Sequence, residues 1–159
     1  MTERSEMREI KMKVNDEWVT GLVKSSTTLL RFLRDNGFTE VKKGCGEGEC
    51  GACTVLLDGK AITSCLVLAM QADGREATTI KKAGDQLLEA LKKAFVKYEA
   101  CQCGFCSPSM IITARWLLDE NPRPNREEIR DALSGNLCRC TGYQKIVDAI
   151  DYISRGRNE

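Results

Sequence analysis

Nine cysteines are the side chains of this sequence best suited to chemistry, and their spacing divides them into two groups. The first group lies between residues 45 and 65, and the second between residues 101 and 140. The sequence contains no histidine, which excludes His-based catalytic triads, His-ligated zinc and His-ligated haem from this chain alone. Closely spaced thiolates therefore indicate a metal centre or redox chemistry.

The first group has the spacing of a known type of cluster. Cys45, Cys50 and Cys53 are separated by four and then two residues, and Cys65 follows. These are the intervals of a plant-type [2Fe–2S] site. Glycines in the same segment, 44–53, allow backbone N–H groups to turn toward the sulfurs and offset the negative charge of the cluster. A flexible turn with incidental thiols is the alternative, and the spacing argues against it.

The second group contains two short pairs, Cys103 with Cys106 and Cys138 with Cys140. Spacing alone leaves two centres open, a structural zinc site with four thiolates and a second [2Fe–2S] cluster. The redox cluster predicted next to it favours iron, because a second redox centre is useful beside the first. The ninth thiol, Cys101, is expected to be a small buried apolar residue. Its sharper interpretation is an alternative ligand or a redox-sensitive thiol.

The thiol pairs of the second group are expected to lie at helix starts. Ser107 directly follows Cys106 and precedes a proline, and Thr141 directly follows Cys140 and begins a capping-box pattern. Free N–H groups and the helix dipole favour negative charge there. This argument supports any anionic thiolate site and does not choose between iron and zinc.

The elements that must position the first group are those of a small mixed α/β unit. Apolar residues alternate over 10–14 before an Asn-Asp turn, and Asp58-Gly59 is typical of a type I′ hairpin between strands 54–57 and 60–62. A short apolar helix is expected after Thr28, and Thr63 is expected to cap another helix through Met70.

The second half is expected to be helical throughout. Apolar residues recur at helical spacing over 87–98, the segment 110–118 is apolar nearly all round, and Asn125 with Glu128 forms a capping box. The polar segment 72–77 is expected to be a turn between two patterns. We therefore predict an α+β protein with two domains: residues 1–76, a β-grasp unit like plant-type ferredoxins, and residues 77–159, a four-helix bundle.

Composition restricts the possible partners. The chain has 24 Lys and Arg against 23 Asp and Glu, so its net charge of +1 argues against a nucleic-acid binder. No apolar run is long enough to cross a bilayer, and the first residues lack the apolar core of a secretory signal. A cytoplasmic location is expected, where disulfides are rare and clustered thiols hold metal.

Three motifs together resemble a known family. The segments 44–55, 102–108 and 135–143 closely resemble the iron–sulfur subunit of the molybdenum hydroxylases, the family of xanthine dehydrogenase, aldehyde oxidoreductase and carbon monoxide dehydrogenase. The resemblance implies one [2Fe–2S] cluster in each domain. Its implied ligands are Cys45, Cys50, Cys53 and Cys65 for the outer cluster and Cys103, Cys106, Cys138 and Cys140 for the bundle cluster.

The same resemblance implies the partners. The bundle cluster is expected near the molybdopterin of a separate large subunit, with Gln102 and Cys140 contacting the pterin, and the outer cluster is expected to face FAD. The sequence ends where the small subunit of the family ends. The flavin and molybdenum domains are therefore expected on separate polypeptides of a hetero-oligomer, such as a dimer of heterotrimers.

The function that follows is electron transfer within a molybdenum hydroxylase or dehydrogenase. No residue of this chain is expected to act on substrate, and the substrate itself is not indicated. Two alternatives are a free ferredoxin that serves several partners and an interaction module stabilised by zinc. The bundle domain argues against the first, because a simple carrier needs only the first half, and the plant-type loop argues against the second.

Overall fold

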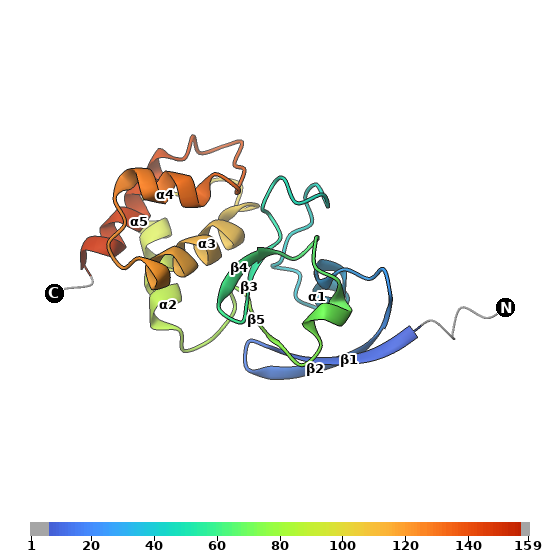
Figure 1. Cartoon of the computed structure of the whole chain (residues 1–159). Helices are drawn as coiled ribbons and strands as arrows, with labels where there is room; N and C mark the ends of the chain where they lie inside the picture. The colour runs from blue at the N-terminus through green and yellow to red at the C-terminus, as the bar shows by residue number, and fades with distance from the viewer. Residues whose placement is uncertain (1–6, 157–159) are drawn as a thin grey trace.

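The computed structural model describes residues 7–156, in which a sheet near the N-terminus is followed by a group of helices (Figure 1). The sheet has five strands in the order β2-β1-β5-β3-β4. Its strands are β1 (Met7–Val14), β2 (Glu17–Lys24), β3 (Thr54–Leu57), β4 (Lys60–Thr63) and β5 (Glu76–Thr78). The helices are α1 (Leu29–Asp35), the 3₁₀ helix η2 (Ala69–Ala72), α2 (Gln86–Lys97), α3 (Ser107–Glu120), α4 (Arg126–Leu133) and α5 (Gln144–Gly156). The predicted α+β class is confirmed.

Both predicted hairpins are present. β1 pairs with β2 and β3 with β4, each pair antiparallel. Positive φ angles at Asn15 (51°) and Asp16 (76°), and at Asp58 (49°) and Gly59 (79°), are those of the type I′ turn that matches the twist of a hairpin. β5 joins the hairpins by running parallel to β1 and antiparallel to β3.

The core of the first unit lies between the sheet and α1. Ile10, Met12 and Val14 are buried, as the alternation along β1 predicts. Leu29 and Leu33 of α1 are also fully buried and belong to the same apolar cluster. The hydroxyl of Thr28 accepts a hydrogen bond from the Arg31 amide, which confirms the predicted cap.

The second unit is built around α3. This helix packs against α2, α4 and the sheet, and eight of its residues are buried. Asn125 caps α4 in a reciprocal box with Glu128, as predicted. The two cores share a strand, because Val55 belongs to the apolar cluster of the sheet whereas Leu56 belongs to that of the bundle.

Two expectations for the segment between Thr63 and Thr78 are wrong. No helix starts at Thr63, which ends β4; Ser64 instead donates to the Cys53 carbonyl, and the only helical turn nearby is η2. The polar turn is real at Asp73 and Gly74 but is followed at once by β5, which lies inside the sheet. A strand of three residues is too short to show the alternation of apolar and polar residues from which strands are predicted.

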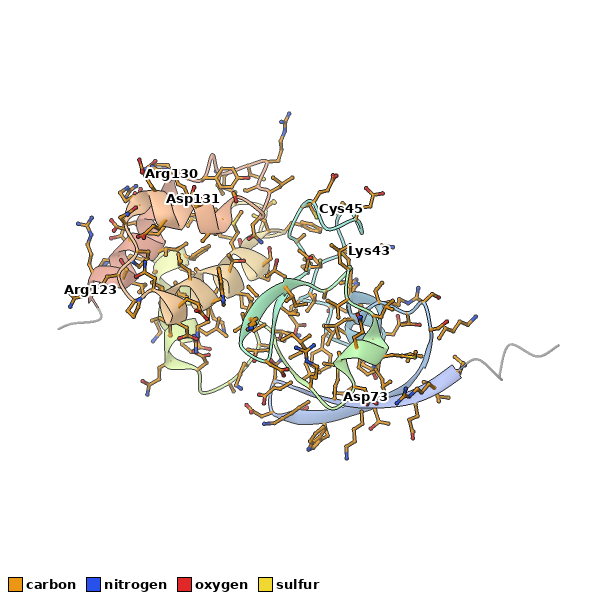
Figure 2. All side chains as sticks on the ribbon, in the orientation of Figure 1. Lys43, Cys45, Asp73, Arg123, Arg130 and Asp131 are labelled. Atoms are coloured by element: carbon orange, nitrogen blue, oxygen red, sulfur yellow. The ribbon has the colours of Figure 1, made fainter. Side chains whose placement is uncertain are left out.

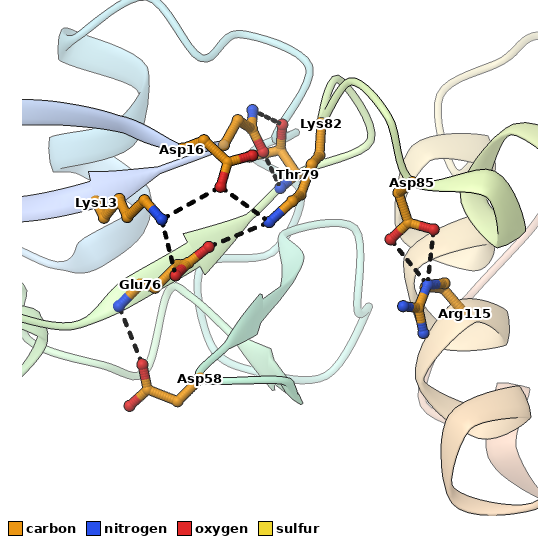
Figure 3. A network of polar contacts seen from close by, with 9 residues as sticks. Lys13, Asp16, Asp58, Glu76, Thr79, Lys82, Asp85 and Arg115 are labelled. Atoms are coloured by element: carbon orange, nitrogen blue, oxygen red, sulfur yellow. Dashed lines mark hydrogen bonds and ion pairs between the residues drawn. The ribbon is translucent and has the colours of Figure 1, made fainter.

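The connection from β5 to α2 is anchored at both ends (Figure 3). Thr79 is buried, accepts a hydrogen bond from Asn15 and donates one to Glu40. At the far end, Asp85 caps α2 and pairs with Arg115 of α3, with an oxygen–nitrogen distance of 2.9 Å.

No helix within residues 7–156 combines the length and apolar character that a bilayer crossing requires.

Candidate metal centres

The first group of thiols lies on the long loop between α1 and β3 and just after β4. Cys45 is exposed near the tip of this loop (Figure 2). Cys53 and Cys65, by contrast, are buried at the sheet end. The structure thus brings all four predicted ligands of the outer cluster to one region, with one side open to solvent and the other packed against the sheet.

Backbone amides of the loop point at the exposed sulfurs. The amides of Glu47 and Cys50 donate to Cys45 Sγ at 3.3 and 3.4 Å, and the Cys45 amide donates to Cys50 Sγ at 3.3 Å. These hydrogen bonds, that from Glu47 foremost, lower the pKa of Cys45 to about 6. The inward-turned N–H groups expected from the glycine-rich sequence are present.

The thiols of each group meet in pairs. In the first group Cys45 pairs with Cys50, and Cys65 interacts with Cys53. In the second group Cys140 Sγ lies 3.3 Å from Cys103 Sγ, while Cys106 interacts with Cys138. Each group therefore presents one pair near the surface and one pair deeper in the protein.

This pairing matches a two-iron cluster better than a single ion. A structural zinc site gathers four thiolates about one point, whereas a [2Fe–2S] cluster takes two thiolates on each iron. The contacts of Cys45 with Cys50 and of Cys103 with Cys140 therefore suit a cluster that takes two thiolates on each iron.

The deeper thiols need a positive partner to ionise. Burial raises the pKa of Cys65 to about 11 and that of Cys106 to about 12. A thiol in such surroundings stays protonated at neutral pH unless a cation compensates the cost of burying its charge. A metal bound by these sulfurs supplies that charge, so the chemistry of the donor set fits an iron–sulfur cluster.

The helix starts of the second group differ from the expectation. Cys106, rather than Ser107, is the N-cap residue of α3, and its side chain makes no capping hydrogen bond. The Thr141 capping box does not form: α5 begins at Gln144, whose side-chain amide donates to the Asp148 carboxylate instead of the Thr141 backbone. The reason lies at Tyr143, whose φ of +67° keeps the chain out of helical geometry. Only the Cys106 thiol therefore lies at a helix N-terminus.

The remaining predicted residues are exposed. Gln102 lies on the surface loop between α2 and α3, directly before the exposed Cys103. Cys101 is exposed as well and accepts a hydrogen bond from Ser107 at 3.2 Å, so the expectation of a buried apolar residue is wrong. A thiol next to surface ligands shares their exposure, which its residue type alone does not reveal.

Sequence reasoning missed two residues that hold the second group in place. Asn136 is 4% exposed and bonds to both units, and the Tyr143 hydroxyl accepts a hydrogen bond from the Cys138 amide at 2.8 Å. Both residues lie inside the motif 135–143. The signal in the sequence was a polar residue, Asn136, close to two predicted ligands. Its hydrogen-bond partners, Gly51 and Thr113, are distant in sequence and could not be predicted.

Comparisons with known proteins agree with this geometry. Residues 12–79 match the model of a 2Fe-2S iron-sulfur cluster binding domain, and residues 78–151 match that of a [2Fe-2S] binding domain. The nicotine 6-hydroxylase small subunit of Paenarthrobacter nicotinovorans is 48% identical over 92% of this chain and 89% of its own. The xanthine dehydrogenase iron-sulfur-binding subunit of Escherichia coli O157:H7 is 49% identical over 78% of this chain and 80% of its own.

A solved structure shares the whole arrangement. Quinoline 2-oxidoreductase from Pseudomonas putida 86 superposes on this chain with a TM-score of 0.88 and 42% identity. The match covers 94% of this chain and 93% of the chain in that structure. The similarity therefore extends over both units and their connection.

Proposed function

Because the chain belongs to the iron–sulfur small subunits of the molybdenum hydroxylases, we propose that it relays electrons from a molybdopterin centre to FAD, both on partner subunits. The chain is a non-catalytic, electron-transferring subunit of an oxidoreductase with two [2Fe–2S] binding regions. The proposal adds which residues hold the clusters, which way the electrons pass and what lies at each end.

We assign the outer cluster to Cys45, Cys50, Cys53 and Cys65, and the bundle cluster to Cys103, Cys106, Cys138 and Cys140. The observation that carries this assignment is the meeting of each set as one exposed and one deeper pair. When bound, each cluster would accept and donate one electron at a time. The domains proposed to hold them are residues 1–76 and 77–159, and β5 crosses the proposed boundary as part of the sheet.

The protein's own contribution is to hold the sulfurs in place and to stabilise their negatively charged thiolate form. Amides of Glu47 and Cys50 donate to Cys45, and Phe105 holds the pKa of Cys103 below its usual value through its backbone N–H. Donors to cluster sulfurs and burial around them are what tune a reduction potential. The two clusters differ in both respects, so their potentials are expected to differ.

The proposed orientation places the exposed pair Cys103 and Cys140, with Gln102 beside it, against the molybdopterin of a large subunit. The exposed loop around Cys45 then faces FAD on a third subunit. Gln102 and Cys140 would contact the pterin. The proposed assembly is a hetero-oligomer, such as a dimer of heterotrimers, and its proposed location is the cytoplasm, where cysteine thiols stay reduced and so remain available as ligands.

Purification of the native complex through a tag on this chain tests the proposal. We expect a molybdenum-containing large subunit and an FAD-containing subunit to co-purify, and substrate to reduce both clusters before FAD in stopped-flow traces. Reduction of FAD before either cluster would overturn the proposed order. A chain that purifies with its iron but without molybdenum would instead support a free ferredoxin.

A further inference from the structure

The side chain of Thr141, which does not cap a helix, faces a proposed cluster ligand instead. Its hydroxyl oxygen lies 3.0 Å from Cys138 Sγ. Thr141 directly follows Cys140, so it belongs to the same short loop as both ligands of the second pair. Thr141 and Cys138 are both half-buried, and a hydrogen bond shielded in this way is stronger than one in open water.

The chemistry of the two groups decides which atom donates. A hydroxyl donates one hydrogen bond and has two lone pairs with which to accept. The Thr141 oxygen already accepts a hydrogen bond from the Tyr143 amide at 3.3 Å. A cysteine sulfur that binds a metal has lost its proton and can only accept. With Cys138 as a ligand, the hydrogen between the two side chains therefore belongs to Thr141.

Tyr143 holds both partners of this contact. Its backbone N–H donates to the Thr141 hydroxyl oxygen, which fixes the position of the donor. Its phenol oxygen accepts from the Cys138 amide at 2.8 Å and donates to the Asn136 carbonyl at 3.3 Å, which fixes the main chain of the ligand. Because the phenol engages the Cys138 amide, that N–H is directed away from the sulfur of its own residue.

The hydroxyl is a donor that a substitution can remove alone. The backbone amides of Cys140 and Thr141 donate to the same sulfur, and a change of the Thr141 side chain keeps both. At the exposed pair of the outer site, the donors that the structure describes are backbone amides. A hydroxyl among its donors therefore distinguishes Cys138 Sγ from that pair.

We infer that the Thr141 hydroxyl raises the reduction potential of the bundle site by donating to Cys138 Sγ, and that Tyr143 positions it for this role. Because the role requires Cys138 as a ligand, it rests on the proposed function. The ligand sulfurs carry more negative charge when the site holds one additional electron. A donor to Cys138 Sγ therefore stabilises the reduced form more than the oxidised form.

The test uses the full chain loaded with both clusters, and EPR-monitored redox titration measures the midpoint potential of each site. Thr141→Val removes the hydroxyl and keeps the shape of the side chain, whereas Thr141→Ser keeps the hydroxyl. Ser107→Ala is the matched control, because the Ser107 hydroxyl donates at 3.2 Å to Cys101 Sγ, a sulfur that is not a proposed ligand. The signal altered in Cys140→Ser identifies the bundle site.

We expect Thr141→Val to keep its iron while the ratio of reduced to oxidised bundle site at a fixed applied potential falls about tenfold. For a one-electron couple this fall is about 59 mV in midpoint potential. Thr141→Ser and Ser107→Ala should keep the wild-type value, and the outer site should be unchanged in every variant. Electron–nuclear double resonance before and after exchange into D₂O should show one exchangeable proton coupling fewer in Thr141→Val.

A wild-type bundle potential in Thr141→Val would overturn the inference. An equal fall in Ser107→Ala, or in Thr141→Ser, would overturn it too, since a general change near the site would then explain the effect. Loss of iron from Thr141→Val would make the residue a support for assembly, which contradicts the proposal. A wild-type chain with only one cluster signal would instead refute the proposed function, so the two failures are distinguishable.

Discussion

At the scale of single residues, sulfur chemistry in this protein depends on which groups face each thiol. Cys45 and Cys65 belong to one set, yet amides lower the pKa of the first to about 6 and burial raises that of the second to about 11. Spacing along the sequence divided the thiols into two groups, and within the second group Cys103 meets Cys140 rather than its sequence neighbour Cys106. It could not predict these surroundings, because the donors come from loop geometry and the burial from a distant sheet.

Gln102 provides the sharpest residue-scale prediction. The four proposed thiolate ligands would complete the bundle site without it, so Gln102→Ala should leave the iron content unchanged. Loss of its proposed hydrogen bond to the pterin in a dry interface should cost about 1–3 kcal/mol. The expected result is weaker docking of the large subunit and slower reduction of the bundle cluster by substrate, measured by stopped flow in the whole complex. Iron loss, or wild-type reduction kinetics, would rule out this role.

Cys140→Ser is the contrasting change at the same surface. It removes a proposed ligand, so the bundle-cluster EPR signal should be lost or altered while the outer-cluster signal persists. Because Cys140 Sγ lies 3.3 Å from Cys103 Sγ, the substitution disturbs the exposed pair and leaves the deeper pair in place. An unchanged bundle signal would show that Cys140 is not a ligand.

At the scale of elements, local patterns predicted the structure where local forces decide it. The hairpin turns and the caps at Thr28 and Asn125 appear as expected, because each depends on a few neighbouring residues. The expected helix after Thr63 does not form, because the Leu30 and Leu29 amides bond to the carbonyls of Ser64 and Val67 and hold that segment against α1. Hydrogen bonds between segments this far apart in sequence cannot be predicted from local sequence patterns.

Asp85 allows the capping and ionic contributions to α2 to be separated (Figure 3). Its carboxylate accepts from the Leu88 amide at 2.9 Å and pairs with Arg115. Asp85→Asn keeps a capping side chain but loses the charge, whereas Asp85→Ala loses both. We expect the free energy of unfolding of Asp85→Ala to fall below that of Asp85→Asn by about 0.5–2 kcal/mol. Equal values in urea titrations would mean that the cap contributes nothing.

At the scale of the whole molecule, the sheet unit and the helical unit are joined through a shared strand and a buried side chain. Its two apolar cores meet at β3, and Asn136 bonds across the two units. The sequence motifs predicted both cluster regions but not this join, which depends on residues such as Gly51 and Asn136 that are distant in sequence. These contacts place the two proposed cluster sites side by side.

The isolated chain should therefore transfer electrons without oxidising an organic substrate. The fold holds a sheet and a bundle, and no molybdenum or flavin domain is found among residues 7–156. Chemically reduced chain should pass electrons to an artificial acceptor such as ferricyanide. Purines, aldehydes and nicotinate with the same acceptor should give no turnover. Turnover of any of them by the pure chain would contradict the proposed division of labour.

Metal analysis of the anaerobically purified chain, combined with EPR after reduction, tests the central claim most directly. Two [2Fe–2S] clusters predict about four irons and about four labile sulfides per chain, with two distinguishable reduced signals. The signals should differ because amides surround Cys45 and Cys50, whereas a helix N-terminus meets Cys106. About two irons per chain, or stoichiometric zinc, would contradict the account.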